Sequence, residues 1–338
     1  MLSRSDIRHP GTERVSETLR WLAVFGAVVL VIFMAALIAV MLRGVADWAA
    51  GHTGMSQRTM LAIVTVLVVV LAAGFLYYIG PKLLAQSQDL WTRLQQTLDH
   101  LRQTYGDTPW GKALFSDISR PKGMQSHIVS YAGTIASVTL GGALTGFILI
   151  ITALYFAISP ELYVGGIVRL FPHRHRPLAH TVLQDIGLTL RRWSLGQLID
   201  MGVVAVLVGV GLGILGVPLS LALAVLAGLF TFVPYFGAIA AAIPAVLLAF
   251  TISWQTSLWV IVIFLVCHTV EGYLIAPIVQ RNTAHLPPAL TILSMTILGT
   301  IFGPLGIILG APVCAALLVL VKEAYVGAVL GDDPATVE

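Results

Sequence analysis

The chain has 338 residues, of which 57% are hydrophobic and only 10% are charged, and its mean hydropathy is +0.91. Soluble domains carry about 25% charged residues, so this composition excludes a water-soluble globular protein. The 19 Lys and Arg residues form no continuous basic stripe, so we expect no nucleic-acid partner. Cys267 and Cys314 lie in separate apolar runs and offer neither a disulfide framework nor a metal-binding pair.

The N-terminal part begins with a basic tail over residues 1–20, followed by predicted membrane helices over residues 21–80. A bilayer core of about 30 Å requires about 20 apolar residues. The uncharged runs Trp21–Leu42 and Leu61–Gly80 therefore each predict a spanning helix. Trp21–Leu42 lacks the small-residue exit of a signal peptide, so we expect it to remain uncleaved. Ile135–Ile158, within residues 128–159, predicts a third spanning helix.

A predicted soluble insertion over residues 81–127 separates the second and third of these helices. Its apolar residues recur at spacings of three, four or seven, as on one face of an amphipathic helix. These residues are Leu83, Leu90, Trp91, Leu94, Leu98, Leu101 and Tyr105. Two roles stay open for this helix: it caps its own bundle, or it forms a contact between subunits.

Residues 160–198 are predicted to form a basic cytoplasmic loop, because Lys and Arg next to membrane helices mark the cytoplasmic side. Its basic residues are Arg169, His173, Arg174, His175, Arg176, His180, Arg191 and Arg192. His173 and His175 have no carboxylate or thiol ligand at a recognisable spacing, so we expect no metal site here.

Residues 199–325 form the predicted transport core, which precedes a tail over residues 326–338. Between Met201 and Val321 the only formally charged residues are Glu271 and Arg281, so this stretch is predicted to lie in the membrane. Two ordinary spanning helices are expected, at Met201–Leu215 and Ser257–Ala276.

Each of these helices precedes an apolar stretch that is too short for two crossings and a turn. The two stretches, Val217–Phe250 and Leu286–Val321, predict broken, re-entrant hairpins. Both contain two prolines 16 residues apart, with a glycine after the second proline, and the copies are offset by 70 residues. The markers of the breaks are Pro218, Pro234 and Gly237 in the first copy, and Pro288, Gly303, Pro304 and Gly306 in the second.

A hairpin returns to its own side, so the two units would enter the membrane from opposite faces. Secondary transporters use such inverted repeats, in which broken helices free backbone groups at mid-membrane to bind a solute or ion. The predicted fold is therefore an all-α polytopic membrane protein with seven or eight transmembrane segments, including the two hairpins.

Several short motifs follow one another over about the last 140 residues. They are Gly196-Gln197-Leu198, Gly216-Val217-Pro218, Pro234-Tyr235-Phe236-Gly237 with Pro244, Glu271-Gly272 with Pro277, Pro288, and Gly303 through Gly306 ending at Pro312. In this order they resemble the motifs of the autoinducer-2 exporter family of bacterial membrane proteins.

This resemblance implies a homo-oligomer, a pentamer in the family, in the bacterial inner membrane. It implies export of a small polar solute, such as autoinducer-2, by an elevator-like motion, although some relatives resemble sodium or lithium/proton antiporters. One departure is that the family has a longer first hydrophobic region, read as two helices, whereas only Trp21–Leu42 precedes the loop Arg43–Arg58 here.

Glu271 is the main candidate for the solute or ion pathway, because an ionisable residue at membrane depth costs about 2.5 to 3.5 kcal/mol on insertion scales. His268 lies three residues earlier, on the same helical face, and would be a second titrating group. The alternative is that Glu271 forms hydrogen bonds to the loop around Arg281 and Asn282 and thereby stabilises the fold. Asn282 is itself a candidate for the pathway.

The other helix-plus-hairpin unit contributes Gln197, which matches the family motif and is the better candidate, and Asp200, for which we favour a structural role at a helix end. Thr231 and Tyr235 flank the Pro234 break. They either line a polar pocket together with unwound carbonyl groups or only cap the break.

A secondary transporter accounts for the paired hairpins better than the alternatives do. A channel would need a ring of filter residues, and a scaffold would not need broken helices. No Ser-His-Asp, HExxH or Walker pattern occurs, so we expect neither an enzyme nor an ATP-driven pump, and no cofactor. Transport would run on a proton or sodium gradient, or be passive.

Overall fold

The computed structural model describes residues 10–75, 77–78, 81, 146–250, 252–275 and 286–331. These residues form helices and turns without any strand, which confirms the predicted all-α fold. The apolar face of the 81–127 insertion, the Arg281 and Asn282 segment and Pro277 lie outside the described residues.

The N-terminal region is built around α1, Pro10–Thr53, which extends the predicted apolar run at both ends. It is followed by the helix Gln57–Phe75 and, later in the chain, by Gly146–Ile158, which is bent by 86° relative to α5, Pro160–Arg169. Small side chains of α1 and of the 146–158 helix share one buried cluster, including Ala39, Ala46 and Ala153, so these helices pack closely.

The longest helix of the C-terminal part is α6, Arg176–Ile214, which follows the short turn η1, His173–His175. The structure therefore corrects the prediction of a loop over 160–198, since α5 and most of this segment are helical. The expected helix Met201–Leu215 is only the last part of α6. With 39 residues, α6 is about 58 Å long.

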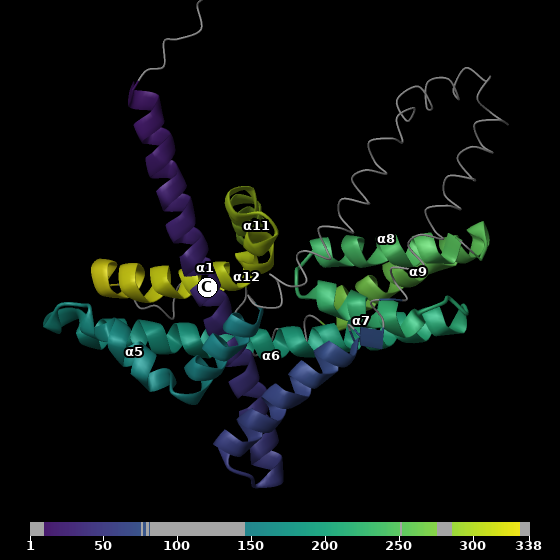
Figure 1. Cartoon of the computed structure of the whole chain (residues 1–338), viewed down its shortest axis with the longest axis horizontal. Coiled ribbons are helices and arrows are strands. Elements are labelled where there is room, and N and C mark those ends of the chain that lie inside the picture. The colour runs from purple at the N-terminus through teal and green to yellow at the C-terminus, as the bar shows by residue number, and fades with distance from the viewer. Residues whose placement is uncertain are drawn as a thin grey trace, which may run out of the picture.

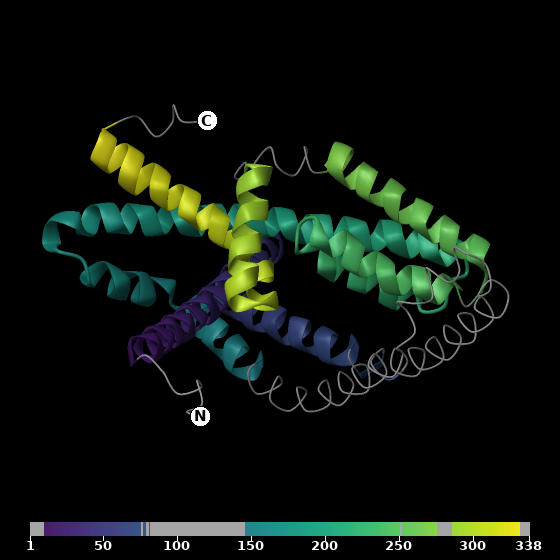
Figure 2. The ribbon, with the colours of Figure 1, turned by 90° about the horizontal axis from the view of Figure 1, so that it is seen from above.

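The other elements pack along α6, which contacts α1, α5, α7, α9 and α12. Figures 1 and 2 show α7, α8 and α9 gathered at one end of α6, with α5 and α12 toward its other end. α1 crosses the middle of α6. The central helix thus joins two separate groups of helices.

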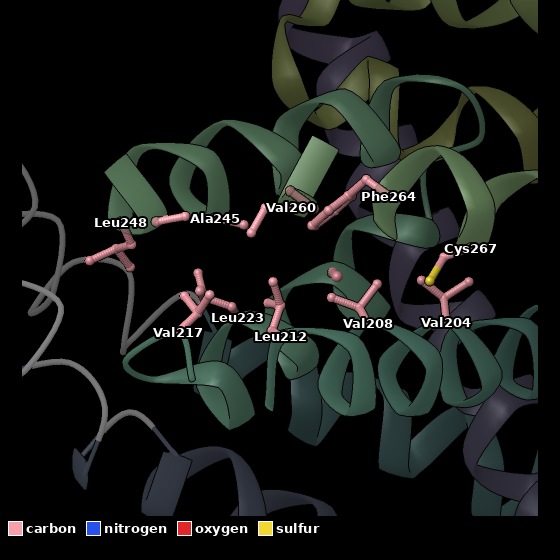
Figure 3. Close-up of a cluster of buried hydrophobic side chains, with 13 residues drawn as sticks. Val204, Val208, Leu212, Val217, Leu223, Ala245, Leu248, Val260, Phe264 and Cys267 are labelled. Atoms are coloured by element: carbon pink, nitrogen blue, oxygen red, sulfur yellow. The ribbon is translucent and has the colours of Figure 1, made fainter. Parts of the chain in front are cut away.

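The first predicted hairpin consists of α7, Ser220–Thr231, and α8, Phe236–Phe250, and it is followed by α9, Trp254–Val270. The chain leaves the helical path between α7 and α8, around Pro234, as the prolines predict. Figure 3 shows how the core between these elements forms: Val204, Val208 and Leu212 of α6 face Val260, Phe264 and Cys267 of α9.

The second predicted hairpin consists of α11, Pro288–Phe302, and α12, Pro304–Leu320, which meet at Gly303 with φ +64°. α12 continues into the π-helical segment η3, Val321–Leu330. The two pairs differ in this respect, because α11 is short but α12 with η3 is long enough to span a membrane.

Five helices of the described part are long and apolar enough to cross a bilayer: Val24–Thr53, Gln57–Phe75, His173–Ile214, Trp254–Leu274 and Pro304–Ala328. The described residues also include three shorter apolar helices, namely α7, α8 and α11. At 12 to 15 residues they are about 18 to 23 Å long, which is less than a bilayer core. The protein is therefore a multi-pass membrane protein.

Candidate functional site

Antiparallel packing of α6 and α9 brings the polar residues of both helices to the same level. Gly211 of α6 lies against Ile263 of α9 so closely that a Cβ atom there would come within 2.6 Å of the isoleucine side chain. Farther toward the start of α6, Val204 faces Cys267. Continuing in this direction, Asp200 comes to lie beside His268 and Glu271, at the end of α9.

The tip of the α7–α8 hairpin reaches the same level because α7 runs antiparallel to α6. Gly209 lies against Ala224, and Gly228 packs on the backbone of Met201. One turn farther along, the side-chain amide of Gln197 donates a hydrogen bond of 2.8 Å to the carbonyl oxygen of Thr231, the last residue of α7. The break after α7 is thereby fastened to α6.

These elements enclose a cavity of about 460 Å³ at the hairpin tip. Its walls come from α6, from the Pro234 break, and from the end of α9 with the π-helical turn η2, Glu271–Ile275. The lining residues are Gln197, Asp200, Thr231, Val233, Pro234, Tyr235, Ala238, His268, Glu271 and Gly272. Isolated π-helical turns are frequent at functional sites.

Two carboxyl groups and one imidazole are the ionisable side chains that line this cavity. His268 Nδ1 lies 3.0 Å from Glu271 Oε2, and Asp200 is within hydrogen-bonding reach of Glu271. The side chains of His268 and Glu271 are only 22% and 23% exposed. Asp200 Oδ1 and His268 Nε2 are buried without a hydrogen-bond partner among the described residues. The cluster thus retains free capacity to bind a proton, a cation or a polar solute.

The backbone at the hairpin tip has an unusual conformation. Tyr235 has φ +67°, a left-handed value that is uncommon for a residue with a side chain. The N–H of Phe236 donates to the carbonyl oxygen of Pro234 at 2.8 Å, so the chain turns sharply at this point. Tyr235 lines the cavity and is 53% exposed as a residue. Such locally strained backbone is common at functional sites.

The structure brings five of the six predicted pathway residues to this cavity, namely Gln197, Thr231, Tyr235, His268 and Glu271. Asn282, the sixth, lies outside the described residues. The prediction that His268 and Glu271 share a helical face is confirmed by their 3.0 Å contact.

The predicted position of Asp200 at a helix end is wrong. The residue lies inside α6 rather than at a helix end, and it contributes to the cavity. Its spacing of three residues from Gln197, at the edge of an apolar run, is the signal that places both on one side of a helix.

The break of the second hairpin lies elsewhere. Phe302, at the end of α11, contacts Gly26 of α1, and no residue of α11 or α12 lines the cavity. At both breaks, however, a glycine lies directly on a carbonyl group of the preceding helix, Gly237 on Phe230 and Gly306 on Leu298.

The described residues contain no group of three His, Cys, Asp or Glu side chains arranged to hold a metal ion.

The family model described as "AI-2E family transporter" matches residues 18–326 of this chain. Similar proteins include "Putative transport protein YhhT" of Escherichia coli K12, 28% identical over 260 residues that cover 75% of this chain and 70% of that protein. "Putative transport protein MT0215" of Mycobacterium tuberculosis is 25% identical over 303 residues, or 86% of this chain and 81% of that protein.

The match to "Putative transport protein YrrI" of Bacillus subtilis is 28% identical over 196 residues and covers 56% of this chain. It spans only 56% of that relative. A second Bacillus subtilis relative, "Putative transport protein YueF", is matched over 52% of its length. The chain thus spans little more than half the length of these two relatives.

Proposed function

We propose that this chain, which belongs to the AI-2E transporter family, is an ion-coupled secondary transporter whose site is the cavity between Asp200, His268 and Glu271. Membership in the family accounts for membrane transport in general. The sequence contains no nucleotide-binding motif, which argues against an ATP-driven pump. The proposal of ion coupling rests on the ionisable residues of the cavity.

The observation that carries this proposal is that two carboxyl groups, those of Asp200 and Glu271, line the same cavity beside His268. Two adjacent carboxylates repel each other unless a proton or a cation is bound between them. Among the described residues that line the cavity, His268 is the only basic one. Loading and release of a proton or sodium ion would thus change the charge of the cavity, which is the requirement for coupling.

The transported solute would be small and polar, as in export of an autoinducer-2-like molecule. A cavity of about 460 Å³ has room for a small metabolite, and its lining offers the Gln197 amide and the Tyr235 hydroxyl as hydrogen-bonding groups. An elevator-like motion of the hairpin relative to α1 would carry this cavity across the membrane. The short α7 and α8 support this proposal, since neither spans a bilayer alone.

A sodium or lithium/proton antiporter is the second candidate. It is favoured by the presence of two carboxyl groups in the cavity, which suit a cation better than a neutral solute. In this case the cation would be the transported species and the proton would replace it at the same oxygens. We regard a channel or a non-transporting scaffold as further alternatives, with no feature of the cavity in their favour.

The test is flux in proteoliposomes that contain the purified protein under imposed proton or sodium gradients. Wild type is compared with Glu271→Gln, which keeps the shape but removes the charge, and with Glu323→Gln in η3 as a matched control outside the cavity. We expect Glu271→Gln to assemble normally and to lose gradient-driven accumulation, while Glu323→Gln retains it.

Repeating the assay with and without a panel of small polar metabolites separates the two candidates. Cation-for-proton exchange without any added solute would identify the antiporter, and accumulation only with a polar metabolite would identify the exporter. Full gradient-driven flux in well-folded Glu271→Gln would refute the coupling role of the cavity.

We further propose that the protein functions in the bacterial inner membrane as a homo-oligomer, a pentamer by family resemblance. The amphipathic segment containing Trp91 and Leu94 would supply a subunit contact. Changing both residues to serine would then lower the particle mass in detergent, and an unchanged mass would leave only capping of its own bundle.

A further inference from the structure

A second and larger cavity, of about 770 Å³, lies away from the proposed transport site. It forms where α1, the helix Gln57–Phe75 and the bend between Ile158 and Pro160 come together. Arg43, Arg58 and Arg169 contribute to its lining, as do Gly165 and Gly166 of α5. No residue is shared with the cavity at Asp200 and Glu271.

The position of Arg43 is set by the bend. Its guanidinium group donates a hydrogen bond of 3.1 Å to the carbonyl oxygen of Ala157, near the end of the helix Gly146–Ile158. Carbonyl groups at a helix end have no partner within the helix, so this arginine satisfies one of them. Its remaining N–H groups have no hydrogen bond within the described residues and can reach a ligand.

The balance of charge in this cavity is positive. Asp47 belongs to the lining, but its carboxylate pairs with Arg191 of α6 at 3.0 Å. Glu161 is the remaining carboxylate of the lining, and it has no ion pair in the described part of the chain. The lining therefore contains three arginines and one carboxylate without an ion pair among the described residues. Guanidinium groups bind phosphate oxygens in a fixed, bidentate geometry.

The cavity lies where three apolar stretches end, although α1 itself continues as a helix to Thr53. Arg43 follows the apolar run of α1, Arg58 is the second residue of the Gln57–Phe75 span, and Ser159 follows the last residue of Gly146–Ile158. These three ends meet in one cavity, so it opens at a membrane surface. Lipid phosphate groups are concentrated at that level, and basic pockets between membrane helices suit anionic headgroups.

We infer that the cavity lined by Arg43, Arg58 and Arg169 binds a phosphate group, supplied by the headgroup of an anionic phospholipid at the membrane surface. The guanidinium groups would bind the phosphate oxygens, and the 86° bend into α5 would make room for the headgroup. Free phosphate has the same chemistry and is the other possible source. This inference does not depend on the transport proposal.

The test uses the full chain in detergent and measures binding of phosphatidylglycerol, phosphatidylcholine and inorganic phosphate by native mass spectrometry and thermal shift. Wild type is compared with Arg58→Gln/Arg169→Gln, since both side chains are exposed and their loss should not impair folding. The matched control is Arg174→Gln/Arg192→Gln, two exposed arginines outside the cavity.

We expect wild type to bind phosphatidylglycerol in preference to phosphatidylcholine, and the Arg58/Arg169 variant to bind it about thirty-fold more weakly, at roughly five-fold per arginine. The control variant should bind as wild type does. Displacement of the lipid by millimolar phosphate would assign the site to soluble phosphate. Equal binding of both lipids, or equal loss in both variants, would overturn the inference.

Discussion

The side chain of Gln197 in α6 is hydrogen-bonded to the main chain of Thr231 at the tip of the hairpin, with 2.8 Å between the amide nitrogen and the carbonyl oxygen. Trp193, one turn earlier on α6, adds an edge-to-face contact with Phe232, at 5.6 Å between ring centroids. Together the two contacts hold the unwound segment around Pro234 beside Asp200. The position of the hairpin tip thus depends on a few side chains of α6.

Changing Gln197 to Ala should release the tip at small cost to the fold. One hydrogen bond of this kind contributes about 1 kcal/mol, and its loss leaves the Thr231 carbonyl without its donor. We expect a modestly lower unfolding temperature in detergent together with a clear loss of transport in proteoliposomes, because the tip lines the cavity.

Ser294→Ala is the matched control for this change. Ser294 donates a hydrogen bond of 2.8 Å to the carbonyl oxygen of Gly310, between α11 and α12, and lies outside the cavity. It should lower stability by a similar amount while transport per folded protein stays near wild type. Equal transport loss in both variants would show that any hydrogen bond between helices matters as much as the one at the tip.

Each hairpin should lose its folded structure when a methyl group is added at the glycine that follows its break. In Gly237→Ala the new Cβ would overlap the Phe230 carbonyl group, and in Gly306→Ala it would overlap that of Leu298. Overpacking costs about 1 to 3 kcal/mol when side chains can adjust, and backbone adjusts less readily. We expect both variants to lose most of their monodisperse yield in size-exclusion chromatography.

Gly213→Ala in α6 provides the comparison, since a Cβ atom there would meet nothing within 4 Å. This variant should be as stable as wild type or slightly more stable, because alanine favours a helix over glycine. Normal yields of Gly237→Ala and Gly306→Ala would mean that the helices of each pair lie farther apart than the structure indicates.

Local spacing predicted part of the candidate site, and tertiary packing supplied the rest. The His268–Glu271 pair follows from helical periodicity within one element, so the sequence was sufficient for it. The approach of Gln197 and Thr231 depends on the antiparallel packing of α6 and α7. Composition and periodicity do not encode this packing, although the family motifs identified both segments.

Asp200 was predicted to lie at a helix end because the basic residues before it were interpreted as a loop. In the structure Arg191 pairs with Asp47 of α1 and Arg192 is exposed, so α6 continues past both without placing an unpaired charge in the core. The equal proline spacing likewise predicted two similar hairpins. It did not reveal that α12 continues through η3 to Leu330.

The topology of the core can be tested by cysteine labelling in intact cells. We expect Arg174→Cys in η1 to react only after permeabilisation, because this basic segment is proposed to be cytoplasmic. Leu221→Cys at the start of α7 and Gln255→Cys at the start of α9 flank the α7–α8 hairpin in the chain, and both should react from outside. Cys267 and Cys314 are buried at 6% exposure and should contribute little background.

The labelling experiment has a definite contrary result. If Arg174→Cys and Leu221→Cys react from the same side, α6 does not cross the membrane between them. If Leu221→Cys and Gln255→Cys react from opposite sides, α7 and α8 together make one crossing instead of a returning hairpin.

Asp200 and Glu271 should behave as one unit when their charges are removed separately and together. Both carboxyl groups line the same cavity, so a proton or cation held between them interacts with both. Substitutions within one interacting group are not additive. We therefore expect Asp200→Asn and Glu271→Gln each to abolish most gradient-driven flux, and the double variant to be no slower than the slower single variant. The measurement is initial flux in proteoliposomes at matched protein content, with Asp47→Asn as a control that removes a carboxylate from the other cavity. Independent sites give a different pattern, in which the fold-losses of the single variants multiply in the double variant. That result would separate Asp200 from Glu271 and leave Glu271 with His268 as the coupling pair.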